Sequence, residues 1–141
     1  MVKNSEPITL LGLDVGDKRI GVARAHSVAK FPEPLTIVAN NEYALNAVLD
    51  LVQKYEAKLV VVGLPLNLQG SETEQSEKTR KFASALKDAT QIPVVFVDES
   101  LTSVMADASP SHKSATLKSN DADAACYILD RYFLEGEVLY V

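Results

Sequence analysis

The stretch "LLGLDVGDKRIGVARAH" at residues 10–26 contains two apolar runs of strand length joined by a short polar segment. Gly16 and Asp17 in that segment suit a tight turn, so the two runs predict an antiparallel β-hairpin. The first run ends on an acid, Asp14, although the residues before it have the composition of a protein core. The rest of the chain must show whether this acid is a turn residue or part of a site.

Three later runs predict further strands. "PLTIVA" at residues 34–39 extends the hairpin to a three-stranded meander. "KLVVVGLP" at residues 58–65 and "PVVFVDE" at residues 93–99 are almost continuously apolar, which is typical of strands covered on both faces.

Helices are predicted between and after these two strands. Apolar residues recur at helical spacing from about Asn41 to Tyr55, with Asn40 or Asn41 near the cap. "SETE", from Ser71 to Glu74, matches a capping box and predicts the start of a second helix.

The order of these elements predicts one α/β domain over residues 1–141, with a mixed five-stranded sheet flanked by helices. The opening meander is antiparallel, whereas each β-α-β crossover makes the next strand parallel. Sites in such sheets gather at the carboxyl ends of the parallel strands. Asp14 ends one such strand, and Asp98 with Glu99 ends another; because Asp98 and Glu99 point to opposite sides, only one of them can face Asp14.

A third acid comes from the last helix. Residues 121, 124, 125, 128 and 132 share one helical face, which places Asp121 on the core-facing stripe and turns Asp123 elsewhere. Taken singly, each acid is also explained as a turn residue, a strand end or a favourable charge in a first helical turn. Three carboxylates held together would repel one another, so a cluster predicts a divalent cation, and the lack of His and Cys favours Mg²⁺ or Mn²⁺.

Composition limits the function classes. The chain has 141 residues, 47% hydrophobic and 23% charged, as in ordinary globular proteins, and its formal net charge of -5 argues against binding a polyanion by bulk charge alone. The single cysteine, Cys126, is expected to be a core thiol in a reducing compartment. The apolar stretch near the amino terminus is too short for a membrane span or a signal peptide, so we expect a cytoplasmic protein without membrane contact.

Four segments together resemble a known family: "LGLDVGDKRIGVA", "VVVGLPLNLQGSETEQSEKTRKFASAL", "PVVFVDESLTS" and "DADAACYIL". In this order they resemble the successive motifs of the YqgF/RuvX family, which is described as Holliday-junction resolvases with a ribonuclease H-like fold. The resemblance runs from Leu11 to about Tyr132. It implies a ribonuclease H-like fold and places the catalytic, metal-binding acids at Asp14, Glu99 and Asp121.

The implied reaction is metal-assisted phosphodiester hydrolysis by a hydrolase of the endonuclease class. Two Mg²⁺ or Mn²⁺ ions about 4 Å apart would activate a water and stabilise the leaving oxygen. Contacts to nucleic acid are expected from Lys18 and Arg19 after the first strand, from Asn67 and Ser71 before a helix amino terminus, and from Thr102. Five more cations could extend this surface, although charges on helix faces are usually only solvated: Lys78, Arg80, Lys81, Lys113 and Lys118.

The chain departs from the family pattern at two positions. The family usually has Arg at the position of Ser100 and a second Thr at the position of Ser103. Loss of the Arg removes a cation beside the acids, which bears on activity more than on fold. A catalytically silent nucleic-acid-binding domain is therefore one alternative. The polar stretch from Ser109 to Asn120 is expected to be a loop.

The resemblance implies two substrates, since the family is linked both to maturation of the 16S rRNA 5′ end and to branched DNA. Cutting a four-way junction symmetrically would need a homodimer. The negative net charge and the lack of a long basic arm favour structured RNA. "LDVGDKRIG" also resembles the first phosphate loop of the actin and sugar-kinase superfamily, but that superfamily binds ATP between two such lobes.

Overall fold

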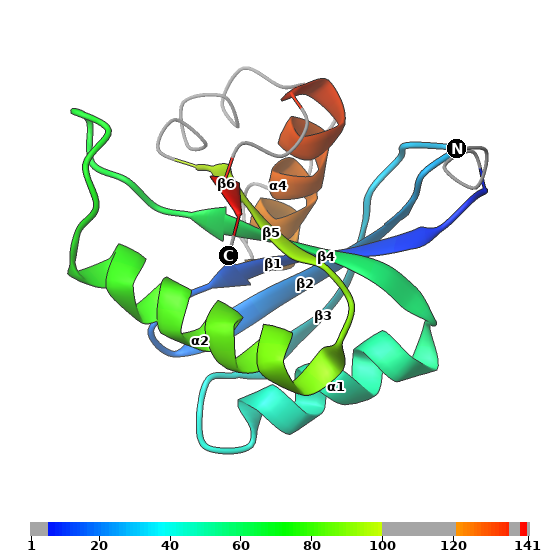
Figure 1. The fold of residues 1–141 in the computed structure, drawn as a ribbon, viewed down its shortest axis with the longest axis horizontal. Coiled ribbons are helices and arrows are strands. Elements are labelled where there is room, and N and C mark those ends of the chain that lie inside the picture. The colour runs from blue at the N-terminus through cyan, green and yellow to red at the C-terminus, as the bar shows by residue number, and fades with distance from the viewer. Residues whose placement is uncertain (1–5, 100–120, 136–138, 141) are drawn as a thin grey trace.

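The computed structural model describes residues 6–99, 121–135 and 139–140 (Figure 1). Six strands form one sheet in the order β3-β2-β1-β4-β5-β6. The elements along the chain are β1 (Thr9–Val15), β2 (Arg19–His26), β3 (Glu33–Ala39), α1 (Ala44–Lys54), β4 (Ala57–Leu64), α2 (Glu74–Thr90), β5 (Val94–Asp98), α4 (Asp121–Glu135) and β6 (Leu139–Tyr140).

The predicted mixed sheet is confirmed for its first five strands. β1, β2 and β3 form the antiparallel meander, and β4 and β5 run parallel to β1. The sequence did not predict β6, which pairs antiparallel with β5 at the edge of the sheet. Two residues are too few to produce the alternation by which a strand is recognised.

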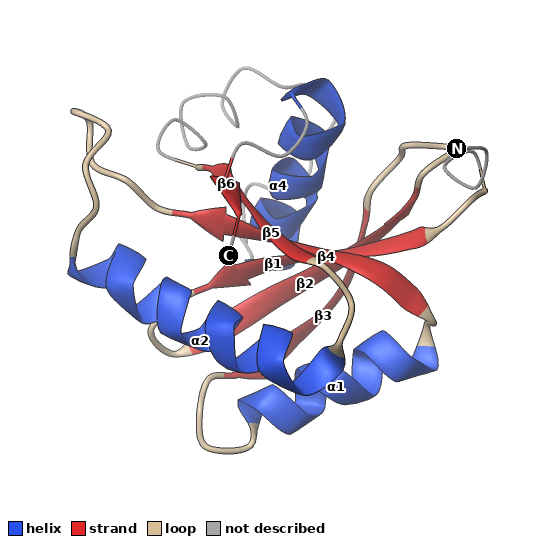
Figure 2. Ribbon diagram, in the orientation of Figure 1, coloured by secondary structure: helices blue, strands red, loops and turns tan. Residues whose placement is uncertain are grey.

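The sheet separates two hydrophobic cores, with α1 and α2 on one face and α4 on the other (Figure 2). Leu13, Val62 and Phe96 belong to the core under α1 and α2. Val61 and Val97 belong to the core under α4. Successive residues of each central strand therefore serve opposite cores, as strand geometry requires.

The core under α4 depends on a close approach between helix and sheet. A Cβ atom added at Gly12 of β1 would lie 2.6 Å from Leu129 Cγ and 3.0 Å from the backbone oxygen of Ala125. Because no side chain intervenes, α4 rests almost directly on the backbone of β1. The same core contains Cys126, which is fully buried, as predicted for a core thiol.

The start of α2 differs from the prediction. The capping box is formed by Thr73 and Ser76 and not by Ser71 and Glu74: Ser76 N donates to Thr73 Oγ1 at 3.4 Å, and Thr73 N donates to Ser76 Oγ at 2.9 Å. Ser71 is engaged in the preceding turn, where its N–H donates to Asn67 Oδ1 and its carbonyl oxygen accepts from Asn67 N. The helix can begin only after that turn closes.

Both edges of the sheet carry features that interrupt strand pairing. The outer strand β3 contains Pro34, which has no N–H to donate, and the β2–β3 register shifts between Val22 and Ala23. At the other edge, β6 covers two residues of β5, Val95 and Phe96. In the described part of the chain, no helix combines the length and apolar character needed to cross a membrane.

The close packing at Gly12 leads to a stability prediction. Gly12→Ala forces α4 away from the sheet and should lower the free energy of unfolding by about 2 kcal/mol, as overpacking of a core does. The midpoint of urea denaturation measures this change. Ala39→Val, which adds methyl groups at an exposed position of β3, is the control and should leave the midpoint almost unchanged. Equal midpoints for Gly12→Ala and the wild type would show that α4 does not rest on Gly12.

Candidate active site

Strand geometry brings Asp14 and Glu99 to the same face of the sheet. Gly12 faces α4, so Asp14, two residues along β1, faces α4 as well. Val97 of β5 packs in the core under α4, which turns Glu99 to that side and Asp98 to the other. The prediction that only one of the two adjacent acids can face Asp14 is thus resolved in favour of Glu99.

A glycine of the intervening strand makes this meeting possible. β4 lies between β1 and β5, and Gly63 of β4 has no side chain on the face that Asp14 and Glu99 share. A Cβ atom there would collide with Glu99 Oε1 and would lie 2.5 Å from Ile128 Cδ1 of α4. Glu99 reaches across β4 only because position 63 is glycine.

The backbone of Glu99 is also fixed. Its N–H donates to the carbonyl oxygen of Leu64 at 3.1 Å, which adds one more hydrogen bond to the parallel ladder between β4 and β5. The side chain is half-buried and is hydrogen-bonded to Asp14. The geometry is therefore that of two carboxyl groups sharing one proton.

Four effects raise the pKa of Glu99 to about 8: burial first, then the negative charge of Asp14, the hydrogen bond to Asp14 and the negative charge of Asp98. At neutral pH the carboxyl pair holds a proton because two adjacent carboxylates repel each other. A divalent cation placed between the two groups would relieve the same repulsion and displace that proton.

The donor set fits a hard divalent cation, since both groups supply carboxylate oxygens. Among the described residues, no three acidic, His or Cys side chains lie close enough together to hold a metal ion. Asp121, the expected third ligand, is the first residue of α4, and its side chain lies outside the described residues. Ile128, two helical turns further along α4, packs over Gly63, so this helix covers the acid pair.

The turn after β1 is tied to two other elements. Gly16 N donates to the Arg19 carbonyl oxygen at 2.8 Å, which closes the turn. Asn40 Nδ2 donates to the Gly16 carbonyl oxygen at 2.7 Å, and Gln75 Nε2 donates to the Val15 carbonyl oxygen at 3.2 Å. This network holds the carboxyl end of β1, and with it Asp14, against β3 and α2.

The expected nucleic-acid contacts lie in different places. Lys18 is exposed on the turn that follows β1, and Arg19 is exposed at the start of β2. Asn67 instead holds the loop between β4 and α2, because its Oδ1 accepts from the N–H groups of Gln69 and Ser71, each at 2.9 Å. Thr102 lies outside the described residues, as do Ser100, Ser103 and the stretch from Ser109 to Asn120.

The amino terminus of α2 is a poor place for a phosphate. Thr73 and Ser76 already satisfy each other's N–H groups in the capping box. Glu74 and Glu77 add two negative charges to the first turn, which complement the helix dipole and repel an anion.

Sequence reasoning predicted both acids as site residues but overlooked Gly63, Asn40 and Gln75. A glycine directly after three valines in the apolar run "VVVGLP" was the signal for Gly63, because glycine inside a strand marks a close approach. Asn40 and Gln75 act through side-chain contacts to backbone atoms far away in sequence, for which the sequence carries no pattern.

The family model and the curated relatives point to the same family. The family model described as "RuvX: Holliday junction resolvase" matches residues 8–135. A protein of Paraburkholderia phymatum named "Putative pre-16S rRNA nuclease" is 36% identical over 130 residues, covering 91% of this chain and 85% of that protein. A protein of Caldanaerobacter subterraneus with the same name is 42% identical over 100 residues, covering 70% of this chain and 72% of that protein.

Among solved structures, RuvC of T. thermophilus in complex with a Holliday junction substrate is similar in fold. The TM-score is 0.61 at 14% sequence identity, and the match covers 95% of this chain and 99% of that one. At this identity the likeness speaks for the fold alone. It confirms the expected ribonuclease H-like architecture, here in its RuvC-like form.

The raised pKa of Glu99 predicts a pH-dependent stability in metal-free buffer. Between about pH 4.5 and pH 8 the folded state holds a proton that the unfolded state releases, so this group's contribution to the free energy of unfolding falls as the pH rises. Glu99→Gln, which mimics the protonated form, should remove that loss. Urea denaturation with EDTA at pH 5.5 and 8 should show the wild type losing about 1–3 kcal/mol more than Glu99→Gln.

Glu42→Gln, at an exposed glutamate of the loop before α1, is the control and should follow the wild type. If Glu99→Gln and the wild type lose the same stability between the two pH values, Glu99 does not hold a proton against Asp14.

Proposed function

The chain belongs to the RuvX family, and from this premise we propose that it is a divalent-metal-dependent nuclease that hydrolyses phosphodiester bonds during maturation of the 16S rRNA 5′ end. The observation that carries the proposal is the contact of Glu99 with Asp14 across Gly63. Pairing two acids in a half-buried place is unfavourable without a cation, which is a reason to assign the pair a catalytic role.

In the proposed mechanism, Asp14 and Glu99 hold the cation through their carboxylate oxygens, with Asp121 as the third proposed ligand. Mg²⁺ or Mn²⁺, two ions in the family mechanism, would supply Lewis acidity that lowers the pKa of a water and stabilises the charge on the phosphate. Glu99 would bind the cation as the carboxylate, after giving up its proton. In the hydrolysis, water would add to phosphorus and lose one proton, the bond to the leaving oxygen would break, and that oxygen would gain one proton.

The remaining expected residues are proposed to bind or position the substrate. Lys18, on the turn after β1, and Arg19, at the start of β2, are exposed and are proposed to bind backbone phosphates on either side of the scissile bond. Such local cations matter in a chain of net charge -5. Asn67 and Ser71 are proposed to shape the loop beside the substrate, and Thr102 to contact it.

Pre-rRNA is the proposed substrate because the curated relatives are named for it and because the net charge is negative. The family model's description instead names the Holliday junction, which supports branched DNA as the second candidate. A junction resolvase would act as a homodimer and nick two strands in pairs, whereas an RNA-processing nuclease needs no such symmetry.

Cleavage assays test this function directly. Wild-type protein in Mg²⁺ or Mn²⁺ should cut a labelled pre-16S 5′ leader in preference to a four-way DNA junction. Asp14→Asn and Glu99→Gln should each reduce the rate about 100-fold or more, because each removes several kcal/mol of transition-state stabilisation. Asp121→Asn should have a comparable effect.

Asp98→Asn is the matched control, since Asp98 adjoins Glu99 but points to the other face of the sheet, and it should retain activity within about threefold of the wild type. Paired nicking of the junction without cleavage of the leader would instead identify the protein as a junction resolvase. Absence of cutting with any metal would support the catalytically silent nucleic-acid-binding domain.

Cation binding can be measured without a substrate. Mn²⁺ at about 100 times its Kd should raise the Tm of the wild type by about 5–10 °C. Asp14→Asn should show no such rise. Calorimetric titration at pH 7 in two buffers of different ionisation enthalpy should show release of about one proton per protein, which comes from Glu99. An unchanged Tm for the wild type would contradict a metal site at the acid pair.

A further inference from the structure

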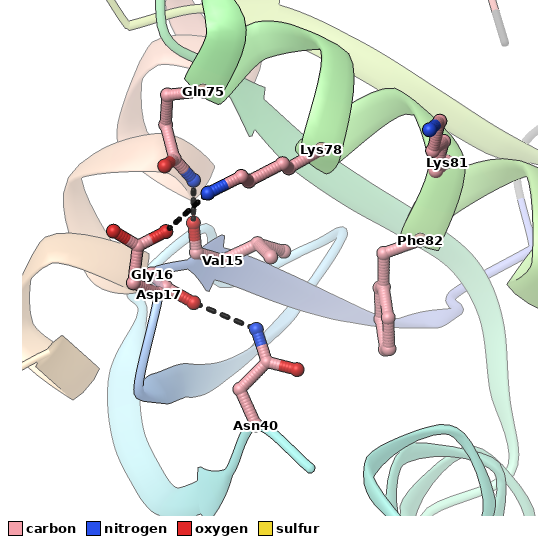
Figure 3. Close-up of a pocket in the computed structure, with 8 residues that line it drawn as sticks. All are labelled: Val15, Gly16, Asp17, Asn40, Gln75, Lys78, Lys81 and Phe82. Carbon is pink, nitrogen blue, oxygen red and sulfur yellow. Dashed lines mark hydrogen bonds and ion pairs between the residues drawn. The ribbon is translucent and has the colours of Figure 1, made fainter. Parts of the chain in front are cut away.

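A hollow of about 370 Å³ lies at the carboxyl end of β1, between the β1–β2 turn, the end of β3 and the first half of α2 (Figure 3). Its volume is within the range of small-ligand pockets. The residues that line it are Val15, Gly16, Asp17, Asn40, Gln75, Lys78, Lys81 and Phe82.

The hollow adjoins the acid pair across the edge of the sheet. Val15, one of its lining residues, directly follows Asp14, and successive residues of a strand point to opposite faces. The acids therefore face α4 while the hollow opens on the α2 side of the same strand end. A nucleic-acid strand cut at the acid pair needs only to pass over this edge to reach the hollow.

Two lysine side chains line one side of the hollow. Lys78 and Lys81 are three residues apart on α2, so they project from the same side of the helix. Lys78 pairs with Asp17 at 3.5 Å, but both side chains are more than half exposed, so the pair is weak and Lys78 can exchange Asp17 for a phosphate. Both lysines are exposed. Arg80 is excluded from this role because it pairs with Glu72 and lies over the ring of Phe96.

The remaining walls suit a nucleobase. Phe82 and Val15 supply apolar surface, and an aromatic ring is a usual partner for an unstacked base. Asn40 and Gln75 donate their side-chain N–H groups to the carbonyl oxygens of Gly16 and Val15, which leaves each amide oxygen as an acceptor.

We propose that this hollow binds one unpaired nucleotide of single-stranded RNA next to the cleaved bond. Its phosphate lies at Lys78 and Lys81, its base packs against Phe82, and the amide oxygens of Asn40 and Gln75 accept from the base. This inference rests on the proposed nuclease function and adds to it a subsite that selects single-stranded over paired substrate beside the scissile phosphate.

The test measures binding of a fluorescent six-nucleotide oligouridylate by anisotropy in EDTA, over a series of salt concentrations. The double variant Lys78→Gln/Lys81→Gln should weaken binding about 10-fold and lower the slope of log K against log salt by about 0.7, the value for one lost phosphate contact on a single strand. Phe82→Leu should weaken binding about fivefold with an unchanged slope, because it removes stacking and no charge.

The control is Lys54→Gln/Lys58→Gln, which removes the same charge at exposed positions of α1 and β4 and should stay within twofold of the wild type. The nucleotide site would be rejected if both double variants weakened oligonucleotide binding equally, or if Phe82→Leu bound as tightly as the wild type. Binding would then reflect only the overall charge of the surface. Because EDTA prevents cleavage, these outcomes are independent of catalysis. If the wild type cuts RNA but the hollow variants bind the oligonucleotide normally, the subsite is rejected and the nuclease assignment stands. If the wild type does not cut RNA but the hollow variants bind more weakly as expected, the nuclease assignment is rejected and the subsite stands.

Discussion

The contact between Glu99 and Asp14 requires a particular strand order, a glycine at one position and a covering helix. Two carboxyl groups from strands that are not neighbours must meet above a third strand, and this requires the order β1-β4-β5 and a glycine at position 63. It also requires a helix that covers the pair on one side, which α4 does with Ile128. The contact raises the pKa of Glu99 to about 8, so the metal-free protein holds a proton where the proposed cation would lie.

Both hydrophobic cores help to position Glu99 and Asp14. The core under α1 and α2 includes Leu13, Leu64 and Phe96, which fix the ends of β1, β4 and β5. The core under α4 is smaller and closely packed against Gly12, so it determines how near the helix lies to the sheet. Hydrogen bonds from Asn40 and Gln75 then hold the end of β1 from the side opposite to α4. Asp14 is thus positioned by contacts on both faces of one strand.

Much of this arrangement could be predicted from the sequence because it depends on periodicity. Alternation along β1 and β5, with the carboxyl-end rule for parallel strands, was enough to select Asp14 and one of Asp98 and Glu99. The start of α2 could not be predicted, because the box that forms uses Ser76 where the sequence pattern expects Glu or Gln, while Ser71, which fits the pattern, is held in the Asn67 turn. β6 is too short to carry a pattern. Gly63 was visible in the sequence but was not interpreted, since its purpose depends on a side chain 36 positions away.

The two interrupted edges of the sheet have a consequence for assembly. An open strand edge recruits further strands, from other copies of the same chain or from unfolded neighbours, and so seeds fibrils. Here Pro34 and the register shift disfavour such growth at β3, while β6 occupies part of the edge at β5. Self-association of this protein in solution would therefore use side chains of its helices and loops in preference to a continuous intermolecular sheet. Concentrated solutions should accordingly resist amyloid-type polymerisation as long as β3 keeps its proline.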